Sequence, residues 1–487
     1  MPVSSLPSPH GIGTFGREAY RFVDFLHAAG QSVWQILPLC PTGVGDSPYQ
    51  SFSTFAGNPY FIDLALLVED GLLTQDEIDA QSWGDDPRAV DYGKLYENRP
   101  VVWKKAFRRF VANPPADFAA FEREQAGWLS GYARFMALKD RYSGAPWYLW
   151  PEPFRSCKGE HPYLDDAPDP AITYYKMLQY LFYKQWRALK AYAGERGVEI
   201  LGDLPIYVSL DSADVWCHPE LFDLDEEGRP VEVAGCPPDA FSEDGQRWGN
   251  PLYDWDAHRK SGFAWWIDRL RQACTLYDRV RIDHFRGFEA YYCIPAKDET
   301  ARDGVWRKGP GMELFCASES ALGKLPILAE DLGYLTPEVY KLLEDSGFPG
   351  MRVMQFAFSD AAGDSAYLPH NFIRQCVAYT GTHDNEPILA WAENASDEEW
   401  TFAKAYLHLT DRASAGEGML RALFASVADL VIVQMQDLLG LGAEGRINEP
   451  STTSGNWVWR ATADDLSDEI AAKAYRFTWL YRRCPKA

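Results

Sequence analysis

The amino-acid sequence predicts an α/β fold, a (β/α)8 barrel, and three features of the chain favour it. Short apolar runs rich in Val, Ile and Leu recur, and their length suits strands buried on both faces. Helical patterns lie between many of these runs, and alternating strands and helices indicate a parallel sheet. Polar residues follow the runs directly, as they do at the carboxyl-end face of a barrel, where functional residues gather.

Seven runs are visible, and an eighth at residues 1–9 would close the barrel, with an open doubly wound sheet as the alternative. Helices are expected at 17–30, 262–277 and 336–348. The last has Thr336 and Pro337 at its start and ends near Gly347, which are good helix boundary signals. The seven expected strands lie within residues 32–41, 198–209, 279–287, 326–334, 351–358, 376–386 and 429–440.

Two gaps between the expected strands are too long for simple loops. We expect one catalytic barrel domain over residues 1–487, with two insertions around its active-site face. Residues 62–190, between the second and third strands, have mostly helical patterns and predict a helical subdomain. Residues 210–260, between the third and fourth strands, are rich in Gly, Pro and aromatic residues without clear periodicity. Such a long irregular segment is usually functional, and we interpret it as a lid.

Composition excludes several classes of protein. The 487 residues carry a net charge of −23, which argues against nucleic acid, anionic membranes and polyanionic substrates as partners. Nine cysteines are scattered singly without a CxxC motif, so we expect reduced thiols in a cytoplasmic protein. No run of 18 apolar residues could span a bilayer, and we expect no signal peptide.

Three expected strand ends each carry an acid, and two of these acids have a basic or imidazole neighbour. The acids are Asp283, Glu330 and Asp384, and among the neighbours are Arg281, His284 and His383. Buried charges are costly unless paired, so such a set should have a use. Two carboxylates at one site are the machinery of glycoside cleavage, in which one attacks the anomeric carbon or activates water and the other protonates the leaving oxygen.

Two other interpretations stay open at this point. A single acid after a strand more often caps a helix or forms an ion pair, although three in a row weaken that explanation. A metal site is the second alternative, since Asp, Glu and His are all metal ligands. The spacings match no ligand signature, and HExxH is absent.

Eight stretches of the sequence, spread in order over nearly the whole chain, carry a resemblance to a known family. They are SLPSPHGIGTFG (5–16), GDSPYQSFSTFAGNPYFIDL (45–64), GDLPIYVSLDSADVW (202–216), CPPDAFSEDGQRWGNPLYDW (236–255), RIDHFRGF (281–288), AEDLG (329–333), GTHDN (381–385) and RINEPSTTSGNWVWR (446–460). In these stretches the chain resembles the 4-α-glucanotransferases of the amylomaltase (disproportionating enzyme) family, glycoside hydrolase family 77. Family members usually carry more residues before the first stretch, and we expect this chain to be without the β-rich N-terminal extension of some relatives.

The resemblance implies a role for each acid. Asp283 would be the nucleophile that forms a covalent glycosyl-enzyme, and Glu330 the general acid/base. Asp384, with His383, would bind sugar hydroxyls and favour the transition state, in which the sugar is distorted. Arg281 would hold Asp283 ionised, because a nearby positive charge lowers the pKa of a carboxyl group.

Other residues would bind the sugar around these acids. His284 is similar to a hydroxyl ligand at the cleaved sugar, and Tyr49 to the aromatic platform beneath that sugar. Asp203 is similar to a supporting acid of the barrel floor, with a purely structural role equally open. The lid would carry Asp239, Phe241, Gln246 and Trp248 over the glucan groove, and a late loop with Asn456 and Trp457 would form another wall; Trp248 could instead be a buried core residue.

The expected function is transfer of a segment of an α-1,4-glucan to the 4-hydroxyl of an acceptor glucose or glucan, by a retaining double displacement. The expected partners are α-1,4-glucans and maltooligosaccharides, with no cofactor and no metal. An α-1,4-glucan hydrolase with the same residues is the first alternative, because the difference lies in access of water. An inactive glucan-binding protein is the second, and the three intact acids speak against it. The sequence leaves the preferred glucan length and the oligomeric state open.

Overall fold

The computed structural model describes residues 1–158, 169–238, 243–333, 335–359, 364–452 and 454–484. Within these ranges, seven parallel strands form the wall of the fold. Six of them lie inside a predicted run, and the seventh, at Gly350–Val353, begins one residue before the run predicted at 351–358. They form two groups, which meet where the backbone N–H of Ala329 donates to the carbonyl of Pro349 at 2.9 Å. The strands are β1 (Val33–Gln35), β2 (Glu199–Pro205), β5 (Arg279–Asp283), β8 (Ile327–Ala329), β9 (Gly350–Val353), β10 (Cys376–Tyr379) and β11 (Leu430–Ile432).

A small interior cavity indicates that the sheet closes into a barrel. It has a volume of about 60 Å³, and both the first and the last of the seven strands contribute to its lining. Gln35 comes from β1, Arg281 from β5, Met351 from β9 and Ile432 from β11. Strands at the two ends of the sequence therefore face one shared interior, which a flat doubly wound sheet would not allow.

The predicted eighth strand at residues 1–9 is wrong. Val3–Ser5 forms a single 3-10 turn (η1) instead. Prolines at positions 2, 7 and 9 remove backbone donors, so this segment cannot supply a regular ladder. The segment still lies beside β1, because the indole Nε1 of Trp34 donates to the carbonyl of Met1 at 2.7 Å.

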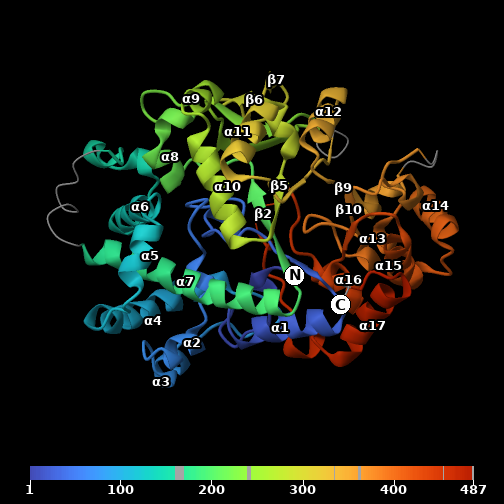
Figure 1. Cartoon of the computed structure of the whole chain (residues 1–487), viewed down its shortest axis with the longest axis horizontal. Coiled ribbons are helices and arrows are strands. Elements are labelled where there is room, and N and C mark those ends of the chain that lie inside the picture. The colour runs from blue at the N-terminus through green and yellow to red at the C-terminus, as the bar shows by residue number, and fades with distance from the viewer. Residues whose placement is uncertain (159–168, 239–242, 334, 360–363, 453, 485–487) are drawn as a thin grey trace.

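The three helices predicted from periodicity are confirmed, and further helices surround the barrel (Figure 1). The last of the three ends as predicted, since Gly347 takes the left-handed conformation with φ of 65°. Helices α1 and α17, from the two ends of the chain, pack together (Figure 1). The helices outside the insertions are α1 (Arg17–Ala28), α10 (Ala264–Leu276), α11 (Met312–Leu322), α12 (Pro337–Ser346), α13 (Ile388–Asn394), α14 (Asp397–Leu407), α15 (Ala415–Ala425), α16 (Met435–Leu439) and α17 (Asp468–Leu480).

Six helices lie between β1 and β2 in the described residues, and they occupy one side of the molecule (Figure 1). The longest, α7, also contacts α1 and β2, so it connects these helices to the barrel. The division of the chain into a barrel domain and inserted subdomains stays a prediction. The helices are α2 (Leu64–Glu69), α3 (Gln75–Asp79), α4 (Tyr92–Ala112), α5 (Phe118–Glu124), α6 (Leu129–Arg141) and α7 (Pro170–Glu195).

The sequence pattern predicts an irregular segment at 210–260, but this prediction is wrong. The segment holds α8 (Ala213–Cys217), α9 (Trp255–Lys260) and two strands of a four-stranded antiparallel sheet. The sequence pattern hides these strands because the register shifts between Val233 and Gly235, which breaks the alternation of side chains. The sheet has the order β4-β3-β6-β7 and consists of β3 (Glu232–Cys236), β4 (Gln246–Pro251), β6 (Ala290–Pro295) and β7 (Val305–Lys308).

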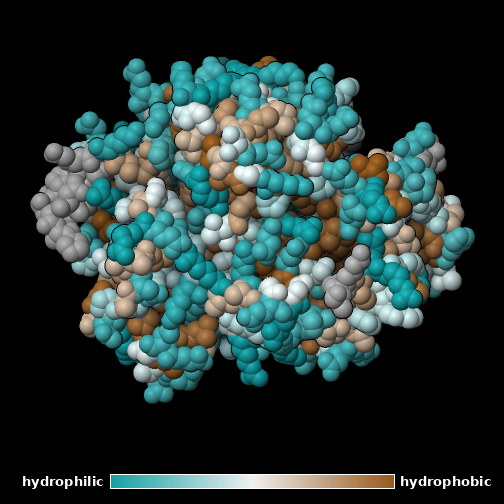
Figure 2. All heavy atoms as spheres, viewed as in Figure 1, coloured by the Kyte–Doolittle hydropathy of each residue, from teal (hydrophilic) through white to brown (hydrophobic). Residues whose placement is uncertain are grey.

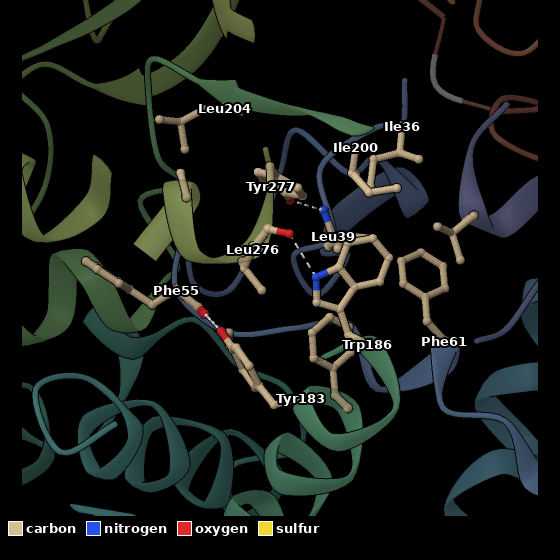
Figure 3. Packing of buried hydrophobic residues seen from close by; sticks show 14 of the residues in the cluster. Ile36, Leu39, Phe55, Phe61, Tyr183, Trp186, Ile200, Leu204, Leu276 and Tyr277 are labelled. Atoms are coloured by element: carbon tan, nitrogen blue, oxygen red, sulfur yellow. Dashed lines mark hydrogen bonds between the residues drawn. The ribbon is translucent and has the colours of Figure 1, made fainter. Parts of the chain in front are cut away.

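One apolar core joins the helices to the barrel, and two of its aromatic side chains on α7 have hydrogen-bonded polar groups (Figure 3). The indole of Trp186 on α7 donates to the carbonyl of Leu276 at 3.1 Å. The hydroxyl of Tyr183, also on α7, donates to the carbonyl of Phe55 at 2.8 Å. Large aromatic side chains therefore fill the core without leaving these donors unpaired.

The face of the molecule shown in Figure 2 is covered mainly by hydrophilic residues, as expected for a net charge of −23. Of the described helices, none combines the length and the apolar character that crossing a bilayer requires.

Gly202 on β2 leaves room for the buried ring of Tyr277, and this contact gives a test of barrel packing. A Cβ at Gly202 would overlap that ring, so we expect Gly202→Ala to lower the free energy of unfolding by about 1–3 kcal/mol. Gly194→Ala on the exposed end of α7 is the matched control, because nothing lies within 4 Å of its Cβ. Urea unfolding measures both, and equal stability of the two variants would contradict the prediction.

Candidate active site

One buried guanidinium connects two carboxylates at the carboxyl end of the barrel. The ladder between β2 and β5 pairs Asp203 with Arg281, so the two side chains lie on neighbouring strands. Nη1 of Arg281 donates to both carboxylate oxygens of Asp203 at 2.8 and 2.7 Å. Nη2 donates to Oδ1 of Asp283 at 2.9 Å, two residues further along the same strand. Arg281 therefore fixes the position of Asp283 from beneath.

Burial dominates the pKa of Asp283. Desolvation raises the pKa of this carboxyl, while the positive charge of Arg281 lowers it. Asp203 and Asp384 add to the rise, and His383 opposes it. Arg281 thus acts in the predicted direction, but the net pKa of Asp283 lies above its usual value, which corrects the expectation that the arginine sets it. The side chain of Asp283 keeps 30% of its surface exposed, so the carboxylate can be reached from outside.

Glu330 follows β8 directly and faces the end of β5. Its backbone N–H donates to the carbonyl of Ile282 at 3.0 Å, which extends the ladder between the two strands by one residue. Its carboxylate accepts the backbone N–H groups of His284 at 2.7 Å and Leu332 at 2.8 Å. Burial first, and then the charge of Asp283, raise the pKa of Glu330 to about 7. A carboxyl group with this pKa can donate and accept a proton near neutral pH.

His284 adopts the left-handed backbone conformation, with φ of 55°, directly after β5. This turn points its N–H at Glu330 and brings its ring edge-on to Trp248, with 4.8 Å between ring centroids. Burial lowers the pKa of His284 to about 3, and the charge of Arg286 adds to this, so the ring is neutral. Its buried Nε2 has no hydrogen-bond partner among the described residues, so the ring can bind a ligand hydroxyl.

Three aromatic rings from distant parts of the chain pack beside the acids. Tyr49 stacks on His383, with 5.1 Å between centroids and 16° between planes. Trp457 packs against both rings at 5.9 and 5.7 Å. The hydroxyl of Tyr49 donates to Oδ2 of Asp203 at 2.6 Å, which joins this aromatic cluster to the Arg281 network.

Asp384 is the most open of the three predicted acids, with 47% of its side chain exposed. Its Oδ1 lies 3.4 Å from Nε2 of His383 and accepts a hydrogen bond of 2.6 Å from the amide of Asn448. Asn448 is a residue that sequence reasoning did not single out, although the quoted stretch RINEP contains it. A lone Asn in a loop carries no signal of its own, and only the fold brings it to Asp384.

The predicted lid and wall residues lie in different settings. Trp248 is half-buried, and its indole donates to the side-chain oxygen of Gln246 at 3.0 Å. Asn456 uses its amide within its own loop, where it accepts from the N–H of Glu449 and donates to Thr452. Asp239 and Phe241 lie outside the described residues.

The fold thus brings the three acids, Arg281, His284, His383, Tyr49 and Asp203 into one connected site. In the described ranges, no group of three or more His, Cys, Asp and Glu side chains could hold a metal ion. The site offers two carboxyl groups with raised pKa values, a third exposed acid and aromatic surface beside them. Such a set can attack an acetal carbon, protonate the leaving oxygen and hold sugar hydroxyls.

Comparisons with known proteins agree with this chemistry. The family model described as 4-alpha-glucanotransferase matches residues 1–465. The chain is 48% identical to a 4-alpha-glucanotransferase of Clostridium butyricum, over 99% of this chain and 100% of the relative. The amylomaltase of Streptococcus agalactiae, solved in complex with acarbose, matches with a TM-score of 0.95 and 44% identity, over 100% of this chain and 99% of the other. The amylomaltase of Corynebacterium glutamicum shares the fold, with a TM-score of 0.78 and 19% identity over 98% and 74% of the two chains.

The hydrogen bond from Tyr49 to Asp203 gives a test of the buried network. Tyr49→Phe keeps the ring but removes a donor to a carboxylate with a fully buried side chain, so we expect the free energy of unfolding to fall by about 1–3 kcal/mol. Tyr192→Phe is the matched control, because its hydroxyl bonds to the exposed Asp24, and we expect a change below about 0.5 kcal/mol. Denaturant unfolding distinguishes the two, and a smaller loss for Tyr49→Phe than for the control would refute the prediction.

Proposed function

The chain belongs to the 4-alpha-glucanotransferase family, glycoside hydrolase family 77, and acts on α-1,4-glucans, and on this premise we propose that Asp283 is its nucleophile and Glu330 its general acid/base. The observation that carries the assignment is the environment of Glu330. Its pKa of about 7 keeps a proton available near neutral pH. The neighbouring Asp283 must be ionised to act as the nucleophile, so the two carboxyl groups need different charge states.

The proposed reaction has two displacements. In the first, a carboxylate oxygen of Asp283 attacks the anomeric carbon, the bond from that carbon to the glycosidic oxygen breaks, and Glu330 gives its proton to the departing 4-hydroxyl. In the second, Glu330 takes the proton of an acceptor 4-hydroxyl, whose oxygen attacks the anomeric carbon and releases Asp283. Two inversions at one carbon retain the α-configuration.

The neighbouring residues support these two steps. Arg281 holds Asp283 in place, and Asp203 in turn holds Arg281. We assign Asp384 and His383 to binding of sugar hydroxyls, because Asp384 is exposed and the pair adjoins the acids. The neutral ring of His284 would bind another hydroxyl, and Tyr49 would lie beneath the cleaved sugar.

Exclusion of water would make the enzyme a transferase rather than a hydrolase. Trp248, an aromatic side chain of the segment 210–260, packs edge-on against the ring of His284, whose backbone N–H donates to Glu330. We therefore assign this segment, with Gln246 and Trp248 and with Asp239 and Phe241 outside the described residues, to the lid. Asn456 would shape the loop that forms the opposite wall.

Maltooligosaccharides are the proposed donors and acceptors, and the acarbose complex of the Streptococcus agalactiae amylomaltase supports a site for oligosaccharides. We also propose a cytoplasmic location, because the nine cysteines are scattered singly without a CxxC motif, as in proteins of reducing compartments.

A sugar donor whose leaving group needs no proton tests the roles assigned to Asp283 and Glu330. We expect Glu330→Gln to lose transfer from maltotriose by a factor of about 10²–10⁴, because no group protonates the leaving sugar. With α-maltosyl fluoride the same variant should still form the glycosyl-enzyme, since fluoride leaves without a proton. The adduct should then accumulate on Asp283, because the base for the second step is missing, and peptide mass spectrometry would locate it.

The double variant Asp283→Asn with Glu330→Gln is the matched control and should form no adduct. An adduct on Asp384, or none on any carboxyl group in a folded Glu330→Gln protein, would disprove the assigned roles.

The pKa of Glu330 predicts the alkaline limb of the pH profile. The protonated form is lost as pH rises through about 7, so kcat/KM for maltotriose should fall about tenfold per pH unit above that point. Glucose release, with reducing ends counted in parallel, measures the rate, and constant reducing ends distinguish transfer from hydrolysis. With α-maltosyl fluoride the alkaline limb should vanish. A flat maltotriose profile between pH 6 and 9 would rule out Glu330 as the acid.

A further inference from the structure

We propose that Cys157 and Cys217 form a reversible intramolecular disulfide, which makes this thiol pair an oxidation site distinct from the glucan site. Their sulfur atoms lie 2.9 Å apart, and the thiol of Cys217 donates to the sulfur of Cys157. Cys157 follows the 3-10 turn η5 (Glu152–Phe154), and Cys217 ends α8. The two residues are 60 positions apart in the sequence, so only the fold brings them together.

The surrounding packing holds the two sulfur atoms in contact. The indole of Trp216, next to Cys217, donates to the carbonyl of Phe154 at 3.0 Å, so α8 and η5 are already docked. Gly131 on α6 leaves the space that the sulfur of Cys217 fills, because a Cβ at this glycine would lie 2.8 Å from it. A bond between the two sulfur atoms therefore requires little movement of the backbone.

The electrostatic setting makes the two thiols unequal. The hydrogen bond from Cys217 lowers the pKa of Cys157, and the charges of Arg134 and Lys158 lower it further, against the opposing effect of desolvation. The same hydrogen bond and burial raise the pKa of Cys217. Since thiolate is the reactive form, the sulfur of Cys157 attacks the oxidant first and Cys217 is the resolving thiol.

A pocket gives small oxidants access to this pair. It has a volume of about 740 Å³, and both cysteines line it together with Trp128, Tyr132 and His218. Both cysteines are half-buried rather than enclosed. Hydrogen peroxide can therefore reach the sulfur of Cys157.

The chemistry balances with hydrogen peroxide as the oxidant. The thiolate of Cys157 attacks one peroxide oxygen, the O–O bond breaks, and sulfenic acid and hydroxide form; the hydroxide takes up the proton that Cys157 had released. The sulfur of Cys217 then attacks the sulfenic sulfur, the disulfide bond forms, and the S–O oxygen leaves as a second water with the proton of Cys217. A dithiol reductant reverses the bond by exchange.

The bond would tie the segment after η5 to α8, which lies directly downstream of β2 and its Asp203. A closed loop of this length restricts the unfolded chain and so stabilises the fold. We therefore expect oxidation to raise the Tm by about 2–5 °C and reduction to restore it.

The test treats the folded full-length protein with hydrogen peroxide and then alkylates the remaining thiols. Titratable thiols should fall from nine to seven, and peptide mapping should find residues 157 and 217 linked, with loss of two hydrogens. Cys157→Ser and Cys217→Ser should each abolish the linked peptide and the rise in Tm. Cys316→Ser is the matched control, because Cys316 is exposed on α11, and it should behave as the wild type.

Three results would overturn the proposal. The first is an oxidised, folded wild type in which no peptide links residues 157 and 217. The second is a disulfide from Cys157 to any other cysteine, and the third is a disulfide between two chains. The Tm of each reduced variant checks its folding, so a missing bond cannot be mistaken for a misfolded protein.

Discussion

The guanidinium of Arg281, held between Asp203 and Asp283, is the interaction on which the active site depends. Its side chain is only 5% exposed, and that of Asp203 is fully buried. Without the arginine, two carboxylates would face each other in a medium that solvates charge poorly, and they would repel each other. The arginine therefore fixes the position of Asp283 and opposes the rise that burial causes in its pKa. Tyr49 completes the arrangement by donating to the same Asp203.

The two reacting carboxyl groups owe their different roles to their surroundings. Asp283 has the arginine beside it and keeps part of its surface open. Glu330 is more deeply buried and lies next to the charge of Asp283, so its pKa rises to about 7. Two backbone N–H groups still fix its carboxylate, and one comes from His284, whose left-handed conformation turns that N–H inward. The turn after β5 thus positions the acid/base as well as a ligand for the sugar.

Sequence reasoning succeeded where one local pattern decides the structure. The seven strand runs and the helices near residues 17, 262 and 336 were predicted because apolar periodicity reports burial directly. It failed where strands pair with segments that are far away in the sequence. Strands β3 and β4 pair around a register shift, and β3 also pairs with β6, so no local alternation reveals them. Prolines at the start of the chain replace the expected eighth strand by a 3-10 turn.

The sequence alone determined the family resemblance, the three acids and their basic neighbours, because these residues lie in contiguous stretches at strand ends. The tertiary structure decided which groups touch. It showed that burial outweighs Arg281 in the pKa of Asp283, that Asn448 holds Asp384, and that the sulfur atoms of Cys157 and Cys217 meet. Contacts between residues far apart in the chain, and the loss of water around them, depend on how the whole chain packs, and no stretch of sequence records either.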